Sequence, residues 1–374
     1  MSGTKRGSRN LLEDVIKAGL CTGCGACVTG CPYMAVHEGR IVVLDRCTID
    51  DGDCWRHCPR TPTDLNLLSE RVQGIPFGGP EPGAILAVEM VRSADAAVRE
   101  KGQDGGVVTA LLAFALDEGM IDSVVCSKKD AHGAPHGFVA GTSRELQECA
   151  GSSYEAAFTL EAFRKIPAGN ADRLAVVGVG CQMEALAKMK AAPPVNGGNP
   201  ENVQLTIGLF CGWALKSDIF RPLLEEICDT SRIVKFDIPH SPGTSFDVYT
   251  KDAGKISVPL DDIRPAINPA CQYCWDMTAE FADISVGSAG SSFHGWNTVI
   301  TRTGRGAELM KRAVAAGIIE IQSLPESRMI KLKESALDRK KNALRRLAQK
   351  SGSREDLGYI SGLSAELVDD LLKD

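Results

Sequence analysis

The pattern of apolar and polar positions predicts a mixed α/β domain over residues 96–334. Short, mostly apolar runs of strand length occur in IDSVVCSK, GFVAGTS, LAVVGVGC, VQLTIGLFC, ADISVGSAG, GWNTVITRT and IIEIQSL. Helical runs are VVTALLAFALDEGM, GSSYEAAFTLEAFRKI, QMEALAKMK, GWALKSDIFRPLLEEI and RGAELMKRAVAAG. Runs of the first kind predict buried strands, and runs of the second kind predict helices with one buried face. Their alternation along the chain predicts a sheet that is covered by helices.

Four other segments, one of them inside this domain, follow different patterns. Residues 1–20 are a polar lead with a short helix in LLEDVIKAGL, and residues 66–95 contain GIPFGGPEPGAI, whose Gly and Pro content predicts a linker. Residues 230–262 hold three strand-like runs and predict a β-rich insertion. Residues 335–374 predict two charged helical pieces that are split by the turn KSGSRED. This tail suits docking on a partner protein or a solvated helix, and we favour the solvated helix.

Composition limits the class of protein. The chain has 374 residues, 44% hydrophobic and 24% charged, which is ordinary for two or three soluble domains. Its net charge of −6 argues against nucleic-acid binding. The sequence has no apolar run of about 18 residues and no apolar leader, so we expect no membrane span and no export. Its 14 cysteines then indicate metal ligands in a reducing cytoplasm.

The strongest motif is a cysteine run near the N-terminus. The spacing C-x2-C-x2-C-x3-C, followed by Pro32, is typical of bacterial ferredoxins, in which three thiolates bind one cluster and the fourth reaches a second. Small residues between the cysteines leave room for the backbone close to a cluster. The four cysteines of this run are Cys21, Cys24, Cys27 and Cys31.

A second, incomplete run contains Cys47, Cys54 and Cys58, with Pro59 after the last. The crosswise ferredoxin rule predicts a first cluster on Cys21, Cys24, Cys27 and Cys58. It predicts a second cluster on Cys31, Cys47 and Cys54, with Asp51, or Asp50 if the loop slips, as the fourth ligand. A three-iron cluster is the other possibility at this site. Zinc is the alternative for the whole region, and the specific spacing favours iron and sulfur.

A glycine-rich turn, Gly102–Gly106, leads into the helical run that starts at Val107. Such a turn exposes backbone N–H groups at a helix N-terminus, where an anion is favoured, and Thr109 adds a hydroxyl. A phosphate or pyrophosphate would suit this position. From the motif alone, we favour an ordinary loop–helix junction.

Four further cysteines lie at positions suited to a shared site. Cys181 and Cys211 each end a predicted strand, which is where open α/β sheets place ligands. Cys271 and Cys274 form a C-x2-C pair. Together they supply four thiolates for one more iron–sulfur cluster. The alternative for the first two is a role as small core residues.

Five segments, in order, resemble the beta-subunit family of coenzyme F420-reducing hydrogenases and dehydrogenases. They are QDGGVVTALL, GVGCQMEAL, IGLFC, CQYCWDMTAEFADISVGSAG and GWNTVITRT, within about residues 80–325. The resemblance implies FAD in the α/β domain, a cluster on Cys181, Cys211, Cys271 and Cys274, and coenzyme F420 over the flavin. It also implies cofactor contacts from Gln103, Asp104, Gly105, Gly106, Thr109, Ser153, Gly287, Ser288 and Trp296.

The resemblance defines the expected fold and domains. Residues 1–65 are a ferredoxin-like iron–sulfur module, 66–95 a linker, 96–334 a flavin-binding mixed α/β domain that also holds a cluster, and 335–374 a helical tail. The fold class is therefore α+β or α/β. One departure concerns the donor: the family's Ser-Lys-Tyr-like turn is Ser152–Ser153–Tyr154 here. Without that lysine, NAD(P)H or ferredoxin could replace the acidic coenzyme F420 as the electron donor.

The expected function is that of an oxidoreductase subunit. A hydride from coenzyme F420 or NAD(P)H enters at FAD, and single electrons pass through iron–sulfur clusters to a partner. That partner would belong to a hydrogenase, a formate dehydrogenase or a heterodisulfide-reductase-like complex. The main alternative is a pure electron-wiring subunit with no substrate site of its own. A ferredoxin-linked reductase for a substrate such as sulfite is a third, weaker hypothesis.

Overall fold

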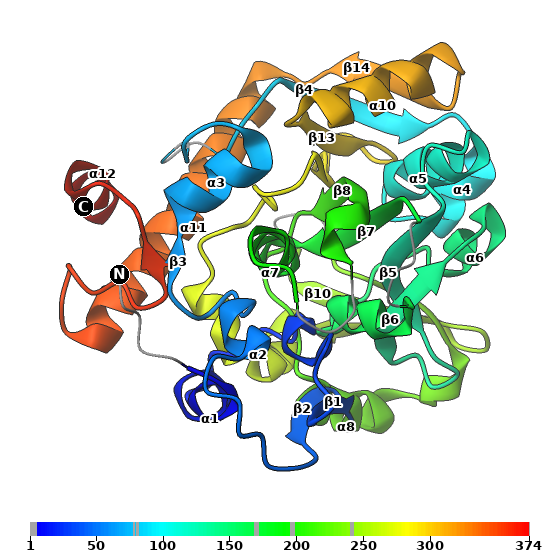
Figure 1. Cartoon of the computed structure of the whole chain (residues 1–374). Helices are drawn as coiled ribbons and strands as arrows, with labels where there is room; N and C mark the ends of the chain where they lie inside the picture. The colour runs from blue at the N-terminus through cyan, green and yellow to red at the C-terminus, as the bar shows by residue number, and fades with distance from the viewer. Residues whose placement is uncertain are drawn as a thin grey trace.

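The computed structural model describes residues 6–77, 79, 82–167, 172–194, 199–239 and 243–373. Its centre is a mixed eight-stranded sheet in the order β14-β4-β13-β12-β8-β7-β5-β6 (Figure 1). Strands β12, β8, β7 and β5 are parallel neighbours, and antiparallel strands flank them on both sides. In chain order the strands are β4 (Ala87–Ser93), β5 (Ser123–Lys129), β6 (Pro135–Ala140), β7 (Leu174–Val179), β8 (Val203–Leu209), β12 (Ile284–Ser288), β13 (Asn297–Thr301) and β14 (Ile319–Ser323).

Helices cover both faces of this sheet because consecutive strand residues point to opposite sides. Val124 and Ala175 pack into one core with α5 and α10, whereas Val125 and Val176 pack into the other core with α7 and α11. The helices on the first face include α4 (Ala96–Lys101), α5 (Val107–Asp117), α6 (Ser143–Glu148) and α10 (Gly304–Ala315). Those on the second face are α3 (Leu65–Gln73), α7 (Gly180–Ala191), α11 (Glu326–Ser351) and α12 (Ala365–Leu372).

The N-terminal module, residues 6–64, lies beside the second face (Figure 1). It contains α1 (Ser8–Leu11), a π-helical turn (Leu12–Lys17), β1 (Met34–His37), β2 (Arg40–Val43), α2 (Asp53–Arg56) and β3 (Thr63–Asp64). Strands β1 and β2 form an antiparallel hairpin, and β3 pairs in parallel with β15 (Ile360–Ser361) near the C-terminus. The two ends of the chain are therefore joined by backbone pairing.

The β-rich segment between Ile233 and Pro259 forms a separate three-stranded sheet in the order β11-β10-β9. Its strands are β9 (Ile233–Asp237), β10 (Ser245–Thr250) and β11 (Gly254–Pro259), and α8 (Ser217–Ile227) and α9 (Leu260–Ile263) pack beside them. Phe220, Phe236 and Phe246 form its core through edge-to-face and tilted ring contacts. The sequence-based prediction of a β-rich insertion is correct.

Three sequence-based predictions of elements are wrong. The expected linker over residues 66–95 contains most of α3 and the sheet strand β4. The helix expected in GSSYEAAFTLEAFRKI is a 3₁₀ helix, Thr159–Lys165, and the residues before it form no helix. The expected solvated tail is instead the long helix α11, whose Ala343, Leu344 and Leu347 are buried in the core of the second face. Among the described residues, no helix has the length and apolar character needed to cross a membrane.

Candidate functional site

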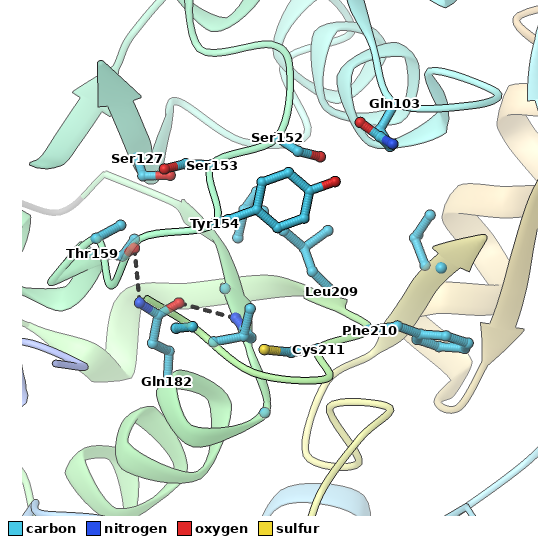
Figure 2. A pocket seen from close by; sticks show the side chains of 18 of the residues that line it. Gln103, Ser127, Ser152, Ser153, Tyr154, Thr159, Gln182, Leu209, Phe210 and Cys211 are labelled. Atoms are coloured by element: carbon cyan, nitrogen blue, oxygen red, sulfur yellow. Dashed lines mark hydrogen bonds between the residues drawn. The ribbon is translucent and has the colours of Figure 1, made fainter. Parts of the chain in front are cut away.

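A cavity of ≈ 630 Å³ opens at the carboxyl ends of β7, β8 and β12. Figure 2 shows Ser153, Tyr154, Gln182 and Cys211 around this space, with Gln103 on the turn at its edge. Seven of the expected cofactor contacts line the cavity: Gln103, Asp104, Gly106, Thr109, Ser153, Gly287 and Ser288. The topology explains their convergence, because parallel strands end at one edge of a sheet.

The turn before α5 has a backbone that few sequences allow. Asp104 and Gly106 have φ angles of 54° and 67°, in the left-handed region. A Cβ at Gly105 would lie 2.7 Å from Asn297 Oδ1 and 2.8 Å from the Val91 carbonyl oxygen. Gly105 therefore packs beneath the turn instead of lining the cavity. The α5 residues Val107, Val108 and Thr109 do line it, so the N-terminus of an 11-residue helix opens on this space.

Gln103 carries a polar atom that needs a partner. Its Nε2 donates to Asp237 Oδ1 at 2.9 Å, whereas its buried Oε1 has no hydrogen-bond partner among the described residues. Buried polar atoms are nearly always hydrogen-bonded in folded proteins. A ligand with an N–H or O–H group in this cavity would satisfy Oε1.

The serine-rich turn forms the opposite wall of the cavity. Tyr154 Oη accepts a hydrogen bond from the Ile238 backbone N–H at 3.1 Å, and burial raises the pKa of this phenol. Tyr154 therefore stays protonated and anchors the turn to the insertion. Trp296 differs from the expectation: it does not line the cavity, and its ring packs against Met90, Ala289 and the guanidinium of Arg92 at 4.5 Å.

Cys181, Cys211, Cys271 and Cys274 line the same cavity. Cys181 is in the first turn of α7, and Cys211 follows β8. Burial raises the pKa of Cys181 and of Cys211, and Cys274 raises it further at both thiols. At Cys271, burial again raises the pKa, although its Sγ accepts a hydrogen bond from the Ala214 N–H at 3.3 Å. The structure thus gathers four thiols from three separate segments.

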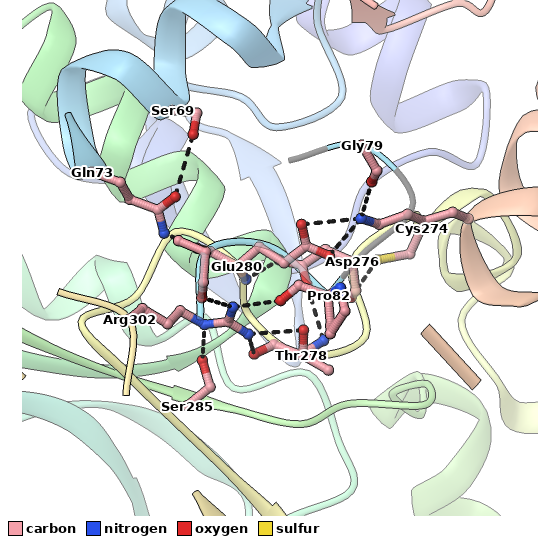
Figure 3. A network of polar contacts seen from close by, with 12 residues as sticks. Ser69, Gln73, Gly79, Pro82, Cys274, Asp276, Thr278, Glu280, Ser285 and Arg302 are labelled. Carbon is pink, nitrogen blue, oxygen red and sulfur yellow. Dashed lines mark hydrogen bonds and ion pairs between the residues drawn. The ribbon is translucent and has the colours of Figure 1, made fainter. Parts of the chain in front are cut away.

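The chain after Cys274 is fixed by a buried polar network (Figure 3). The Asp276 carboxylate accepts hydrogen bonds from the backbone N–H groups of Thr278 (3.0 Å) and Glu280 (2.9 Å). Arg302 donates to Ser285 Oγ at 2.8 Å and to the Thr278 carbonyl at 3.1 Å. The Cys274 thiol donates to the Asp276 carbonyl at 3.4 Å. The network orients the C-x2-C segment toward the cavity.

A second, small cavity of ≈ 20 Å³ lies in the N-terminal module. Its lining includes Cys21, Cys24, Cys27 and Cys58, surrounded by apolar side chains such as Leu11 and Phe158. Burial raises the pKa of Cys27, and the charges of Cys24, Cys21, Cys58 and Cys54 raise it further, in that order. These four thiols from both runs therefore face one small space.

Another group of thiols lies in the segment that follows the first cysteine run. Burial raises the pKa of Cys54 to about 12, and Cys31 and Cys47 both add to the rise, so these three are close together. Asp51 is directed elsewhere: its carboxylate is about half exposed and lies 3.5 Å from the Arg56 guanidinium. Among the described residues, no three His, Cys, Asp or Glu side chains are arranged to hold a single metal ion.

Several polar residues between these groups carry no recognisable motif in the sequence. Lys188 Nζ, from α7, donates to the Cys58 carbonyl at 2.7 Å and to Thr63 Oγ1 at 2.9 Å. Asn268 Nδ2 donates to the Cys21 carbonyl at 3.0 Å. Arg60 lines the large cavity together with Thr22 and Gly23. One sequence signal for this arrangement exists: the spacing of Cys181, Glu184 and Lys188 places all three on one face of α7.

Comparison with known proteins gives the family. The model "Coenzyme F420 hydrogenase/dehydrogenase, beta subunit N-term" matches residues 90–164, and the model for the C-terminal part of the same beta subunit matches residues 171–327. The chain is 34% identical over 254 residues to coenzyme F420 hydrogenase subunit beta of Methanosarcina barkeri, covering 66% of this chain and 85% of that protein. The chain belongs to the coenzyme F420 hydrogenase/dehydrogenase beta-subunit family. A "4Fe-4S binding domain" model also matches residues 14–37.

Other members of the beta-subunit family extend the comparison. The coenzyme F420-dependent sulfite reductase of Methanocaldococcus jannaschii is 29% identical over 336 residues, which cover 86% of this chain but 50% of that enzyme. A chain from the F420-reducing [NiFe] hydrogenase complex of Methanosarcina barkeri has a TM-score of 0.64 at 28% identity, covering 72% of this chain and 94% of that chain. The family's mixed α/β fold therefore extends over most of this chain.

Proposed function

We propose that this family member is an iron–sulfur flavoprotein subunit. It exchanges a hydride with a soluble carrier at FAD and passes single electrons through three clusters to a partner subunit. The observation that carries the proposal is the shared cavity. One space of ≈ 630 Å³ adjoins both the glycine-rich turn with its helix N-terminus and the thiols of Cys181, Cys211, Cys271 and Cys274.

The donor atoms present suit these groups. The unpartnered Oε1 of Gln103 and the N-terminus of α5 suit a ligand that has both a polar ring edge and phosphates. When bound, FAD supplies the exchange between hydride transfer and single-electron transfer. The turn and the N-terminus of α5 would hold this group, with the thiols of the cavity beside it.

The proposed cluster ligands fall into three groups. The first group is Cys21, Cys24, Cys27 and Cys58, the second is Cys31, Cys47 and Cys54, and the third is Cys181, Cys211, Cys271 and Cys274. The side chain of Asp51 would have to leave Arg56 to complete the second group. We therefore favour a three-iron cluster, or an external fourth ligand, at the second group.

Coenzyme F420 is the first choice of carrier, because the names of the family relatives connect them with it. NAD(P)H is the second choice, since the serine-rich turn offers no cation to an acidic coenzyme. The partner would be another subunit of a hydrogenase, formate dehydrogenase or heterodisulfide-reductase-like complex. A wiring subunit without flavin would leave Gln103 Oε1 and the turn unexplained.

Anaerobic purification followed by titration tests the proposal. We expect about one flavin per chain, iron and sulfide sufficient for three clusters, and bleaching of the flavin band by one of reduced F420, NADH or NADPH. The variant Gln103→Leu removes the proposed flavin contact. It should lower the flavin content while the iron content stays at the wild-type level. Full iron content without flavin would favour the wiring subunit, and zinc in place of iron would refute the proposal.

A further inference from the structure

Arg60 is a buried cation with unused hydrogen-bond donors. Its side chain is 4% exposed, and Nε and Nη2 have no hydrogen-bond partner among the described residues. Nη1 donates to the Pro59 carbonyl at 3.1 Å, and the guanidinium carbon lies 4.5 Å from the centre of the Tyr359 ring. A guanidinium stays charged in proteins, so this site contains a fixed positive charge whose N–H groups need acceptors.

The place of this charge is between two groups of thiols. Arg60 follows Cys58-Pro59 in the chain, and its side chain lines the large cavity together with Cys181, Cys271 and Cys274. The backbone N–H of Arg60 donates to Cys58 Sγ of the first group at 3.4 Å, so the residue contacts one group and lines the cavity of the other. One residue is thus close enough to act on both groups.

Three ionisable side chains outside the thiol groups act on Arg60: Glu184, Lys188 and Tyr359. Burial raises the pKa of Glu184 to about 7, and Arg60 and Lys188 only partly oppose the rise. Lys188 adds another positive charge, although burial lowers its pKa. Burial raises the pKa of Tyr359, so this phenol stays neutral. Glu184 and the cysteine sulfur atoms are therefore the groups that can offer negative charge to Arg60.

We propose that Arg60 is a positioning residue that electrostatically links the cluster of the N-terminal module to the cluster of the cavity. This inference rests on the proposed function, because it requires both clusters. An electron added to either cluster makes it more negative, and a positive charge between them stabilises the reduced form of both. Arg60 therefore raises both reduction potentials together and leaves the difference between them nearly unchanged.

Redox titration of the anaerobic, cofactor-loaded full chain, followed by electron spin resonance, tests this link. In Arg60→Gln we expect the ratio of reduced to oxidised cluster at a fixed potential to fall about tenfold at both clusters, which is about 59 mV for one electron. Arg60→Lys keeps the charge and should lose less at both. Arg339→Gln is the matched control, because Arg339 contacts the carbonyl oxygens of Cys211, Gly212 and Cys271. It should lower only the potential of the cavity cluster.

The outcomes separate this inference from the proposed function. An unchanged reduction potential at either cluster of iron-loaded Arg60→Gln would overturn the link. So would a fall of the potentials in Arg60→Lys as large as that in Arg60→Gln. If Arg60→Gln does not assemble its clusters, the wild-type spectrum still decides. When both clusters of the wild type are reduced, its spectrum should show a spin–spin interaction between them that disappears in Cys271→Ser. A wild-type spectrum without this interaction would overturn the link. Absence of iron from the wild type would instead refute the proposed function.

Discussion

At the scale of single residues, the glycines between the cysteines show how closely the N-terminal module fits the rest of the chain. Gly25 has a φ of 88°, and a Cβ there would lie 2.5 Å from the Phe158 carbonyl oxygen. Gly19 also has a positive φ, 71°, but nothing lies within 4 Å of its Cβ position. The two positions share a backbone cost and differ in steric cost.

We predict that Gly25→Ala destabilises the protein much more than Gly19→Ala. The left-handed backbone alone costs about 1 kcal/mol, which is the expectation for Gly19→Ala. Overlap with a backbone atom that cannot rotate away should bring Gly25→Ala to about 3 kcal/mol or more, with loss of iron from the first group. Chemical unfolding and iron content measure both. Equal losses in the two variants would show that Phe158 moves freely.

The structure brings together thiols that the spacing grouped, whereas the sequence did not predict the charges around them. Spacing alone assigned Cys58 to the group of Cys21, Cys24 and Cys27, and the structure gathers these four around one small cavity. It could not predict Arg60 or Glu184, because their burial depends on α7 packing against the module. The Asp51 alternative came from counting positions, and a count does not reveal the nearby Arg56.

At the scale of elements, α11 is the clearest case of tertiary structure overriding sequence pattern. Its composition is strongly charged, which favoured a solvated helix. In the structure, Lys340 is buried and its Nζ lies 2.9 Å from Glu280 Oε1, with both side chains 3% exposed. Lys340 Nζ also lies 4.8 Å and 5.5 Å from the ring centres of Phe77 and Trp275. Lys340, one of the charges that favoured a solvated helix, therefore helps to bind α11 to the core.

We predict that Lys340→Met lowers the free energy of unfolding by about 3–5 kcal/mol, because it leaves Glu280 buried without its cation. Lys331→Met is the matched control on the same helix, where the side chain is exposed, and should cost less than about 0.5 kcal/mol. The double variant with Glu280→Gln should recover part of the loss. Denaturant unfolding of Lys340→Met, Glu280→Gln and the double variant measures this coupling. If the losses of the two single variants simply add in the double variant, the two side chains are not coupled.

Two other errors at this scale have the same origin. Gly and Pro around residue 80 suggested a linker, yet β4 starts at Ala87 and lies between β13 and β14. Its neighbours in the sheet are distant in sequence, so no local pattern reveals them. The segment before Thr159 reads as helical because of its alanines, but Phe158 N and Leu160 N bond to the carbonyls of Gly23 and Cys24. Pairing with the module replaces the helix there.

At the scale of the whole molecule, the three thiol groups form a series from the cavity to the surface. Arg60 lines the cavity of one group and contacts Cys58 Sγ of the next, and the charge of Cys54 acts on Cys27 in the following step. The segment around Cys47 exposes Val43, Leu44 and Ile49, with exposed fractions of 48%, 61% and 55%. Under the proposed function, we expect electrons to pass between the cavity and a partner through the group of Cys31, Cys47 and Cys54.

We predict that Cys54→Ser separates entry from exit. The hydride donor should still bleach the flavin and reduce the two inner clusters, because the cavity and the first group are intact. Sustained reduction of a protein-sized one-electron acceptor should fall about tenfold or more, because the last step of the series is lost. Cys228→Ser is the control, since Cys228 packs in the insertion core and lines neither cavity. Stopped-flow bleaching and steady-state acceptor reduction measure the two processes separately. Unchanged steady-state rates in iron-loaded Cys54→Ser would mean that electrons leave from an inner cluster, and the surface around Cys47 would then have no part in transfer.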